Sequence, residues 1–210
     1  MTRRMARYCG IKLIVAATML PGVVGFAPVA QAQFSEGYNF LKAVRDADGA
    51  KVMELVDRPG STLIDSRDIS TGETALMIVV ARRDLSWLNF LLSKGAKPDL
   101  GDRAGNTPLI AATQLRFADG VRALLTKGAS VDKPNGSGET ALIRAVQLRD
   151  VSLIRILVDA GANPDKRDTL AGLSARDYAQ RDGRAGPIMD ALAKAKPGSA
   201  TKAPVQGPVF

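Results

Sequence analysis

The stretch Gly105-Asn106-Thr107-Pro108-Leu109, at the centre of the 210-residue chain, decides the fold because its pattern is repeated. It recurs 33 residues earlier as Gly72-Glu73-Thr74-Ala75-Leu76 and 33 residues later as Gly138-Glu139-Thr140-Ala141-Leu142. A second block, ending in Gly-Ala, follows each copy at the same period, in residues 91–96, 124–129 and 157–162. Two separate blocks that keep one period over three copies predict a stack of repeated structural units.

Each copy predicts two short helices joined by a turn. Pro108 fits the first position of the first helix, because its missing N–H costs nothing there. The residue before that position has a hydroxyl free to accept a hydrogen bond from a backbone N–H, in Thr74, Thr107 and Thr140. The second helix of the first clear copy is expected from about Leu85 to Lys94, burying Leu88, Leu91 and Leu92. A glycine in the left-handed conformation then ends each second helix, at Gly95, Gly128 and Gly161.

This pattern resembles the ankyrin repeat, in which a β-turn leads to a first helix opened by Thr-Pro-Leu-His and a second helix ends in Gly-Ala. The resemblance covers roughly residues 36–195. It implies an all-α solenoid of about five repeats, an L-shaped stack whose concave face is built from hairpin tips and first helices. The outer copies are degenerate, as expected of capping repeats. The first has Glu36 in the place of the glycine, and the last starts one residue late at Gly172, with a second helix from about Pro187 to Lys196.

The sequence departs from the family pattern at the His that follows Leu. In the family, that His takes part in a hydrogen-bond network between repeats. In this sequence Met77, Ile110 and Ile143 occupy its position. We therefore expect apolar packing to substitute for the network.

A second departure lies in the turn between the two helices. The family usually has Gly there, because the backbone requires a positive φ. The central copies have Arg83, Arg116 and Arg149, and only the last copy has a glycine, Gly183. Stacked helices lie about 8–10 Å apart, so the three arginines would form a column along one edge. The column is interpreted either as solvated side chains at a strained turn or as a guanidinium ladder for carboxylates or phosphates.

The family implies partner contacts on the concave face and at the hairpin tips. The two positions before each turn are Ala81 with Arg82, Gln114 with Leu115, Gln147 with Leu148, and Arg181 with Asp182; the tips add Arg103, Asn106, Asn135, Glu139 and Arg167. From these and the column we select a candidate partner-binding set: Arg82, Arg83, Arg103, Asn106, Gln114, Leu115, Arg116, Gln147, Leu148, Arg149 and Arg181. Leu115 and Leu148 would either form an apolar contact patch or be partly buried between neighbouring first helices. The polar residues at the tips are interpreted either as partner contacts or as residues that only keep the tips soluble. Trp87 is expected to pack across the convex edge, the alternative being an exposed anchor for a partner.

Composition excludes several kinds of chemistry. The chain has no His and one Cys, Cys9, which rules out His- or Cys-rich zinc sites, Cys–His nucleophiles and Ser–His–Asp triads. The glycines are explained by turns and helix ends, so none is needed for a phosphate-binding loop. No catalytic residue, metal or cofactor is therefore expected.

The net charge of +8 belongs to the two ends of the chain. Residues 1–32 contain four of the 29 basic residues and residues 193–210 contain three, neither segment with an acid, which leaves 22 basic and 21 acidic residues between them. A nearly neutral body argues against nucleic-acid binding.

The N-terminus predicts export. A basic start is followed by an apolar run from Leu13 to Phe26, and Ala30 and Ala32 are the small residues expected before a cleavage site ahead of Gln33. An uncleaved anchor is the alternative, although the run is short for a membrane span. The expected organisation is a signal peptide in residues 1–32, a repeat domain in 33–196 and a disordered Pro-, Ala- and Lys-containing tail in 197–210.

These observations favour a non-catalytic interaction protein that is exported from a bacterial cytoplasm to the periplasm. We expect it to be monomeric. Its expected partner is another protein, with an acidic face if the arginine column binds it, and neither a nucleic acid nor a small-molecule substrate. The first alternative is an envelope-surface binder that docks through Lys194, Lys196 and Lys202. An enzyme is the least favoured class.

Overall fold

A computed structural model describes residues 29–182 and 185–194 of the chain, and this part contains ten α-helices, a short 3-10 helix η1 and no strand. The bounds of the elements are α1 (Val29–Arg45), α2 (Gly49–Val56), η1 (Leu63–Asp65), α3 (Ala75–Ala81), α4 (Leu85–Ser93), α5 (Pro108–Gln114), α6 (Ala118–Thr126), α7 (Ala141–Gln147), α8 (Val151–Asp159), α9 (Ala175–Arg181) and α10 (Gly186–Ala193).

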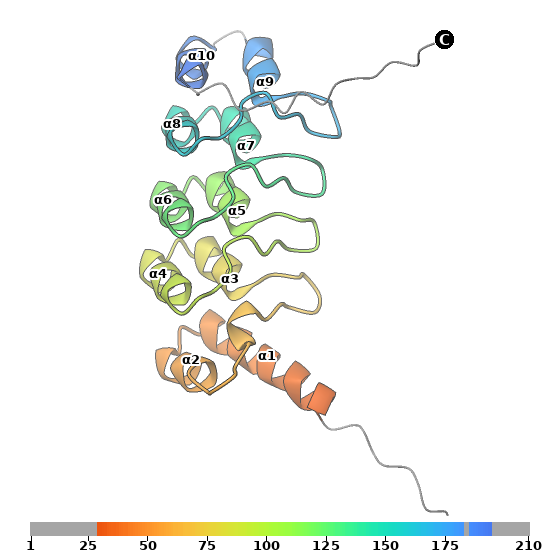
Figure 1. The fold of residues 1–210 in the computed structure, drawn as a ribbon, viewed down its shortest axis with the longest axis vertical. Coiled ribbons are helices and arrows are strands. Elements are labelled where there is room, and N and C mark those ends of the chain that lie inside the picture. Colours follow the sequence, from red (N-terminus) through yellow and green to blue (C-terminus); the bar gives the residue numbers. More distant parts are fainter. Residues whose placement is uncertain (1–28, 183–184, 195–210) are drawn as a thin grey trace, which may run out of the picture.

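The helices form two layers, with hairpin loops extending from one side (Figure 1). The first helices α1, α3, α5, α7 and α9 follow one another in one layer, and the second helices α2, α4, α6, α8 and α10 in the other. Each helix packs against its partner in the same repeat, and all the first helices and the second helices from α4 to α10 also pack against their counterparts in the neighbouring repeats. The predicted all-α solenoid of about five repeats is confirmed. We call the loop before each of α3, α5, α7 and α9 a finger.

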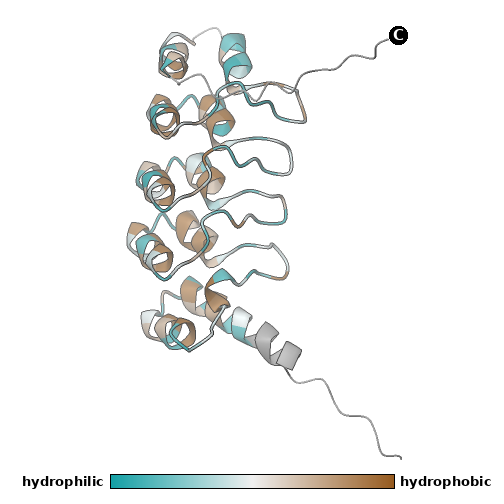
Figure 2. Cartoon of the chain, in the orientation of Figure 1, coloured by the Kyte–Doolittle hydropathy of each residue, from teal (hydrophilic) through white to brown (hydrophobic). Residues whose placement is uncertain are grey.

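One continuous apolar core joins the two layers from α1 to α10. Figure 2 shows it as hydrophobic colour along the helices, with hydrophilic colour in the fingers. As predicted, α4 buries Leu88, Leu91 and Leu92. The inner faces of the first helices contain fully buried alanines, which let neighbouring helices approach closely: Ala75, Ala112, Ala145 and Ala179.

The predicted helix ends are largely as expected. Gly95, Gly128 and Gly161 have φ values of 89°, 84° and 90°. The hydroxyls of Thr107 and Thr140 accept hydrogen bonds from the backbone N–H groups of Ile110 and Ile143. The same prediction was wrong for Thr74, whose buried hydroxyl has no hydrogen-bond partner in the described part of the chain; nothing in the structure explains this difference.

The two outer copies differ from the central ones. In the first, α1 continues through Glu36, so a helix replaces the finger expected there. The counterparts of Glu36 are glycines with positive φ, and a glutamate instead favours the helix. In the last copy α10 spans Gly186–Ala193, shorter than predicted, and Gly183 lies outside the described residues.

Candidate binding surface

The fingers are held together by backbone hydrogen bonds between successive repeats. The N–H groups of Arg103, Gly136 and Thr169 donate to the carbonyl oxygens of Thr71, Ala104 and Ser137, at 3.1, 2.8 and 2.9 Å. This close approach requires glycine: a Cβ atom on Gly105, which has a φ of 79°, would lie 2.7 Å from the backbone nitrogen of Gly136. The fingers therefore form a fixed ladder beside the first helices.

The arginine column has the backbone conformation predicted for it. Arg83, Arg116 and Arg149 have φ values of 55°, 52° and 55°. Sequence reasoning missed a fourth inter-helix turn with this backbone conformation, at Ala47, which has a φ of 57°. Its position 36 residues before Arg83, the offset of the first copy, was the available signal. A non-glycine residue in this region costs about 1 kcal/mol or more, so the inter-helix turns store strain in four repeats.

The side chains of the column connect each turn to the next repeat. Arg83 donates to the carbonyl oxygen of Leu115. Arg116 donates to the carbonyl of Leu148 at 2.7 Å and lies 3.3 Å from the Asp150 carboxylate. Arg149 pairs with Asp182, with 2.6 Å between Nε and Oδ2. These side chains are solvent-exposed at strained turns, as one interpretation expected, but their guanidinium groups also join successive repeats.

Three more candidate residues are engaged within the protein. Arg82 donates to the carbonyl oxygens of Val44 and Arg45, at 2.7 and 3.0 Å, and so ties its turn to the preceding repeat. Leu115 is half-buried against the core and Leu148 is also half-buried. Partial burial between neighbouring first helices thus describes the two leucines better than an open apolar patch.

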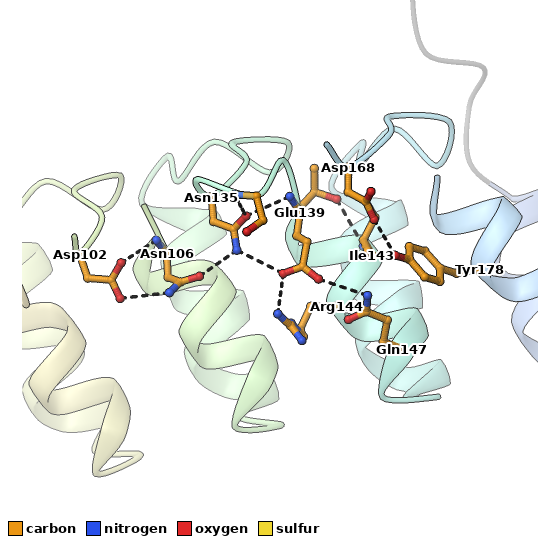
Figure 3. A network of polar contacts seen from close by, with 11 residues as sticks. Asp102, Asn106, Asn135, Glu139, Ile143, Arg144, Gln147, Asp168 and Tyr178 are labelled. Atoms are coloured by element: carbon orange, nitrogen blue, oxygen red, sulfur yellow. Dashed lines mark hydrogen bonds and ion pairs between the residues drawn. The ribbon is translucent and has the colours of Figure 1, made fainter. Parts of the chain in front are cut away.

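A polar network crosses the bases of the fingers (Figure 3). The Asn135 amide donates to Asn106 at 3.0 Å and to Glu139 at 3.3 Å. The Glu139 carboxylate also accepts from Arg144 at 2.6 Å and from Gln147 at 3.2 Å. Thus Asn106, Asn135 and Glu139, expected at the finger tips, link two repeats.

This network corrects one expectation from the sequence. Met77, Ile110 and Ile143 are buried, as apolar packing requires. However, apolar packing does not act alone, because hydrogen bonds between repeats are present and come from other residues. The available signal was the pair of amides, Asn106 and Asn135, placed 29 residues apart in successive fingers.

A second cluster joins the last finger to α9. The Tyr178 hydroxyl donates to the Asp168 carboxylate at 2.6 Å, and Gln147 also hydrogen-bonds the Tyr178 side chain. Burial by itself would raise the pKa of Asp168, but hydrogen bonds from Tyr178 and from the backbone N–H groups of the finger lower that pKa overall. The bond to Asp168 and burial raise the pKa of Tyr178. These contacts with Asp168 and Glu139 place Tyr178 and Gln147 on the finger side of the first helices, the concave face.

The remaining candidates are exposed. Gln114 and Arg181 are the last residues of α5 and α9, and Gln147 is the last residue of α7. Arg103 is exposed on its finger and donates to the carbonyl of Ile69. Three exposed side chains thus occupy one place in three successive first helices, beside the ladder of fingers.

An apolar depression of about 270 Å³ lies on the outer face between α2 and α4. Trp87 lies half-buried there, with its ring 5.7 Å from that of Phe90 in an edge-on contact and the Arg82 guanidinium 5.8 Å above it. Gly49, Met53 and Ser86 complete the lining. Trp87 packs between the second helices, as predicted, while one side of it borders this depression.

The described residues contain no group of three or more His, Cys, Asp or Glu that could hold a metal ion. In the same residues no helix has the length and apolar character needed to cross a membrane. A sequence model for ankyrin repeats (3 copies) matches residues 40–135 and 76–168. The two matches together span residues 40–168, which is more than half of the chain.

Proposed function

This chain belongs to the ankyrin repeat family, and from that premise we propose that it is a non-catalytic, periplasmic protein-binding module that uses its concave face and fingers. Repeats of this family generally mediate protein–protein interaction. The observation that carries the proposal is the row formed by Gln114, Gln147 and Arg181, exposed at equivalent places along the concave face.

The face is organised before any partner binds. The finger ladder and the polar network fix one wall, and the arginine column holds the first helices at a set spacing. A surface that is already ordered loses less conformational entropy on binding, so more of the contact energy appears as affinity. This supports recognition of a partner by shape and side-chain pattern.

Site-specific photo-crosslinking tests the binding face. A photoreactive amino acid is placed at Gln114, on the concave side, or at Arg122, which is exposed on α6 in the outer layer. After irradiation in intact cells we expect protein adducts from position 114 and few from position 122. Adducts from position 122 alone, or none from position 114, would contradict a concave binding face.

Export rests on the N-terminal pattern and has its own test. Cleavage between Ala32 and Gln33 would remove the first four residues of α1 and leave a mature chain without cysteine, as suits an oxidising compartment. The intact mass of protein recovered from a periplasmic extract should correspond to a chain that begins at Gln33. A mass that includes Cys9 would argue against processing at this site.

A further inference from the structure

The concave face changes its chemistry along the stack. At one position of the first helix, successive repeats have Ile78, Ala111, Arg144 and Tyr178. One turn later they have Ala81, Gln114, Gln147 and Arg181. Small and apolar side chains therefore give way to long polar ones toward α9. A partner that crosses this face meets most of its hydrogen-bonding groups in the last two repeats.

A recess of about 300 Å³ lies at this polar end, between the last turns of α7 and α9. Its lining combines an aromatic ring, an amide and charged groups: Val146, Gln147, Arg149, Tyr178, Arg181 and Asp182. The two neutral polar walls are fixed from behind, because Gln147 donates to Glu139 and Tyr178 donates to Asp168. The recess thus keeps its shape without a ligand.

Most cations around the recess are already neutralised. Arg144 is 2.6 Å from Glu139, Arg149 is 2.6 Å from Asp182, and on the last finger Arg167 is 3.0 Å from Asp177. Arg181 differs, since it is exposed and makes no hydrogen bond or ion pair with any other residue that the structure describes. Its charge acts on Asp177 only at longer range, as a minor contribution beside the hydrogen bonds from Ser174 that lower the pKa of that carboxyl. The Arg181 guanidinium has five N–H donors in a planar fork, which matches the two oxygens of a carboxylate.

We propose that this recess binds the carboxylate side chain of an Asp or Glu residue in the protein partner, with Arg181 as its ionic partner and Tyr178 and Gln147 as walls. The proposal rests on the proposed function and narrows it to one docking position and one chemistry. A single guanidinium outside any ion pair balances the single charge of a carboxylate. A phosphate group carries nearly two charges and calls for more cations than the recess offers.

Nuclear magnetic resonance of the full isotope-labelled chain tests the recess without the natural partner. The probe is N-acetyl-glutamate N-methylamide, and the glutamine analogue is the matched neutral probe. We expect saturable shifts of the Arg181 Nε–H, the Gln147 side-chain amide and the Tyr178 ring with the glutamate probe only. An exposed ion pair of this kind contributes modestly to affinity, so Arg181→Gln should weaken binding of the probe by about 1.5-fold to fivefold.

A matched variant controls for loss of charge. Arg155, on α8 in the outer layer, is also an exposed arginine without a hydrogen bond or ion pair to the described residues, and Arg155→Gln should bind the probe as the parent does. Equal shifts with both probes, or unchanged affinity in Arg181→Gln, would overturn the proposal. Crosslinking from position 114 is independent of this titration. Adducts without a carboxylate response would refute the recess alone. Saturable binding without adducts would refute the concave protein-binding role, and with it the protein partner of the recess, while the carboxylate chemistry of the recess would stand.

Discussion

The guanidinium of Arg116 donates a 2.7 Å hydrogen bond to the carbonyl oxygen of Leu148, the C-cap residue that directly follows the first helix of the next repeat. The last carbonyls of a helix have no partner within it, so this donor satisfies one of them. Arg116 itself has a φ of 52°, where glycine would be less strained. The contact across the repeat boundary therefore offsets the strain of a large residue in the left-handed region.

Substitutions at Arg116 separate these two effects. Arg116→Ala keeps the strained backbone and removes the contacts with Leu148 and Asp150, so we expect a loss of about 1 kcal/mol in the free energy of unfolding. Arg116→Gly removes the same contacts but also relieves about 1 kcal/mol of strain, so its free energy of unfolding should be close to that of the parent. Urea denaturation measures both. If the glycine variant were clearly more stable than the parent, the hydrogen bond to Leu148 would contribute nothing.

Ala47 provides the same strain without the arginine contacts. It is exposed in the first inter-helix turn with a φ of 57°. Ala47→Gly should therefore raise the free energy of unfolding by about 0.5–1 kcal/mol, because relief of backbone strain exceeds the extra entropy of glycine in the unfolded chain. The check is a higher urea midpoint with an unchanged slope. Ala50→Gly, at the second residue of α2, is the comparison and should be destabilising, because a helical φ offers no strain to relieve.

The sequence predicted features that repeat and missed those that depend on contacts between repeats. Gly95, Gly128, Gly161 and the arginine column could be located because a helix end or a tight turn imposes a local backbone requirement. The partners of the column could not be foreseen. Arg116 and Leu148 are 32 residues apart, and their contact depends on how one repeat is rotated on the next.

The candidate surface was predicted less completely than the fold for a related reason. Side chains at the tips and turns are polar whether they bind a partner or their own neighbours. Asn106 and Arg82 were selected as contact residues, yet Asn106 bonds to Asn135 and Arg82 bonds to the preceding repeat. Glu36 was placed in a finger, but the described residues contain no earlier repeat for that finger to stack on, and the segment is helical.

The finger ladder predicts unequal costs for similar glycine substitutions. Gly95 has a φ of 89° and open space where a Cβ atom would lie, whereas a Cβ on Gly105 would lie 2.7 Å from the backbone of Gly136. Gly95→Ala should cost only backbone strain, about 1 kcal/mol. Gly105→Ala should cost about 2–4 kcal/mol, because overpacking is added and the finger must shift. Thermal unfolding of both variants measures the difference. Equal losses would show that the fingers are not closely packed.

The Tyr178–Asp168 hydrogen bond predicts a stability that depends on pH at both ends of the scale. Folding lowers the pKa of Asp168 below the ordinary value of 3.8. The contribution of Asp168 to the free energy of unfolding is therefore fully present above pH 3.8 and is lost as the pH falls through the pKa of the folded chain. Folding raises the pKa of Tyr178 above 10.0. The contribution of Tyr178 to the free energy of unfolding is therefore fully present below pH 10.0 and is lost as the pH rises through the pKa of the folded chain. The pair therefore contributes most near neutral pH.

Tyr178→Phe removes the hydroxyl and leaves the buried Asp168 carboxylate without that donor. A buried charged group that loses a hydrogen-bond partner costs about 1–3 kcal/mol, so this is the expected loss near neutral pH in urea denaturation. The difference between parent and variant should shrink below pH 3.8, where Asp168 is protonated in the unfolded chain, and again above pH 10.0, where Tyr178 ionises in the unfolded chain. Tyr38→Phe is the control. Because Tyr38 is 60% exposed on α1, loss of its hydroxyl should change the free energy of unfolding little. A Tyr178→Phe difference that stayed constant from acid to alkaline pH would mean that the hydroxyl stabilises the fold through a contact that does not titrate, and not through its bond to Asp168.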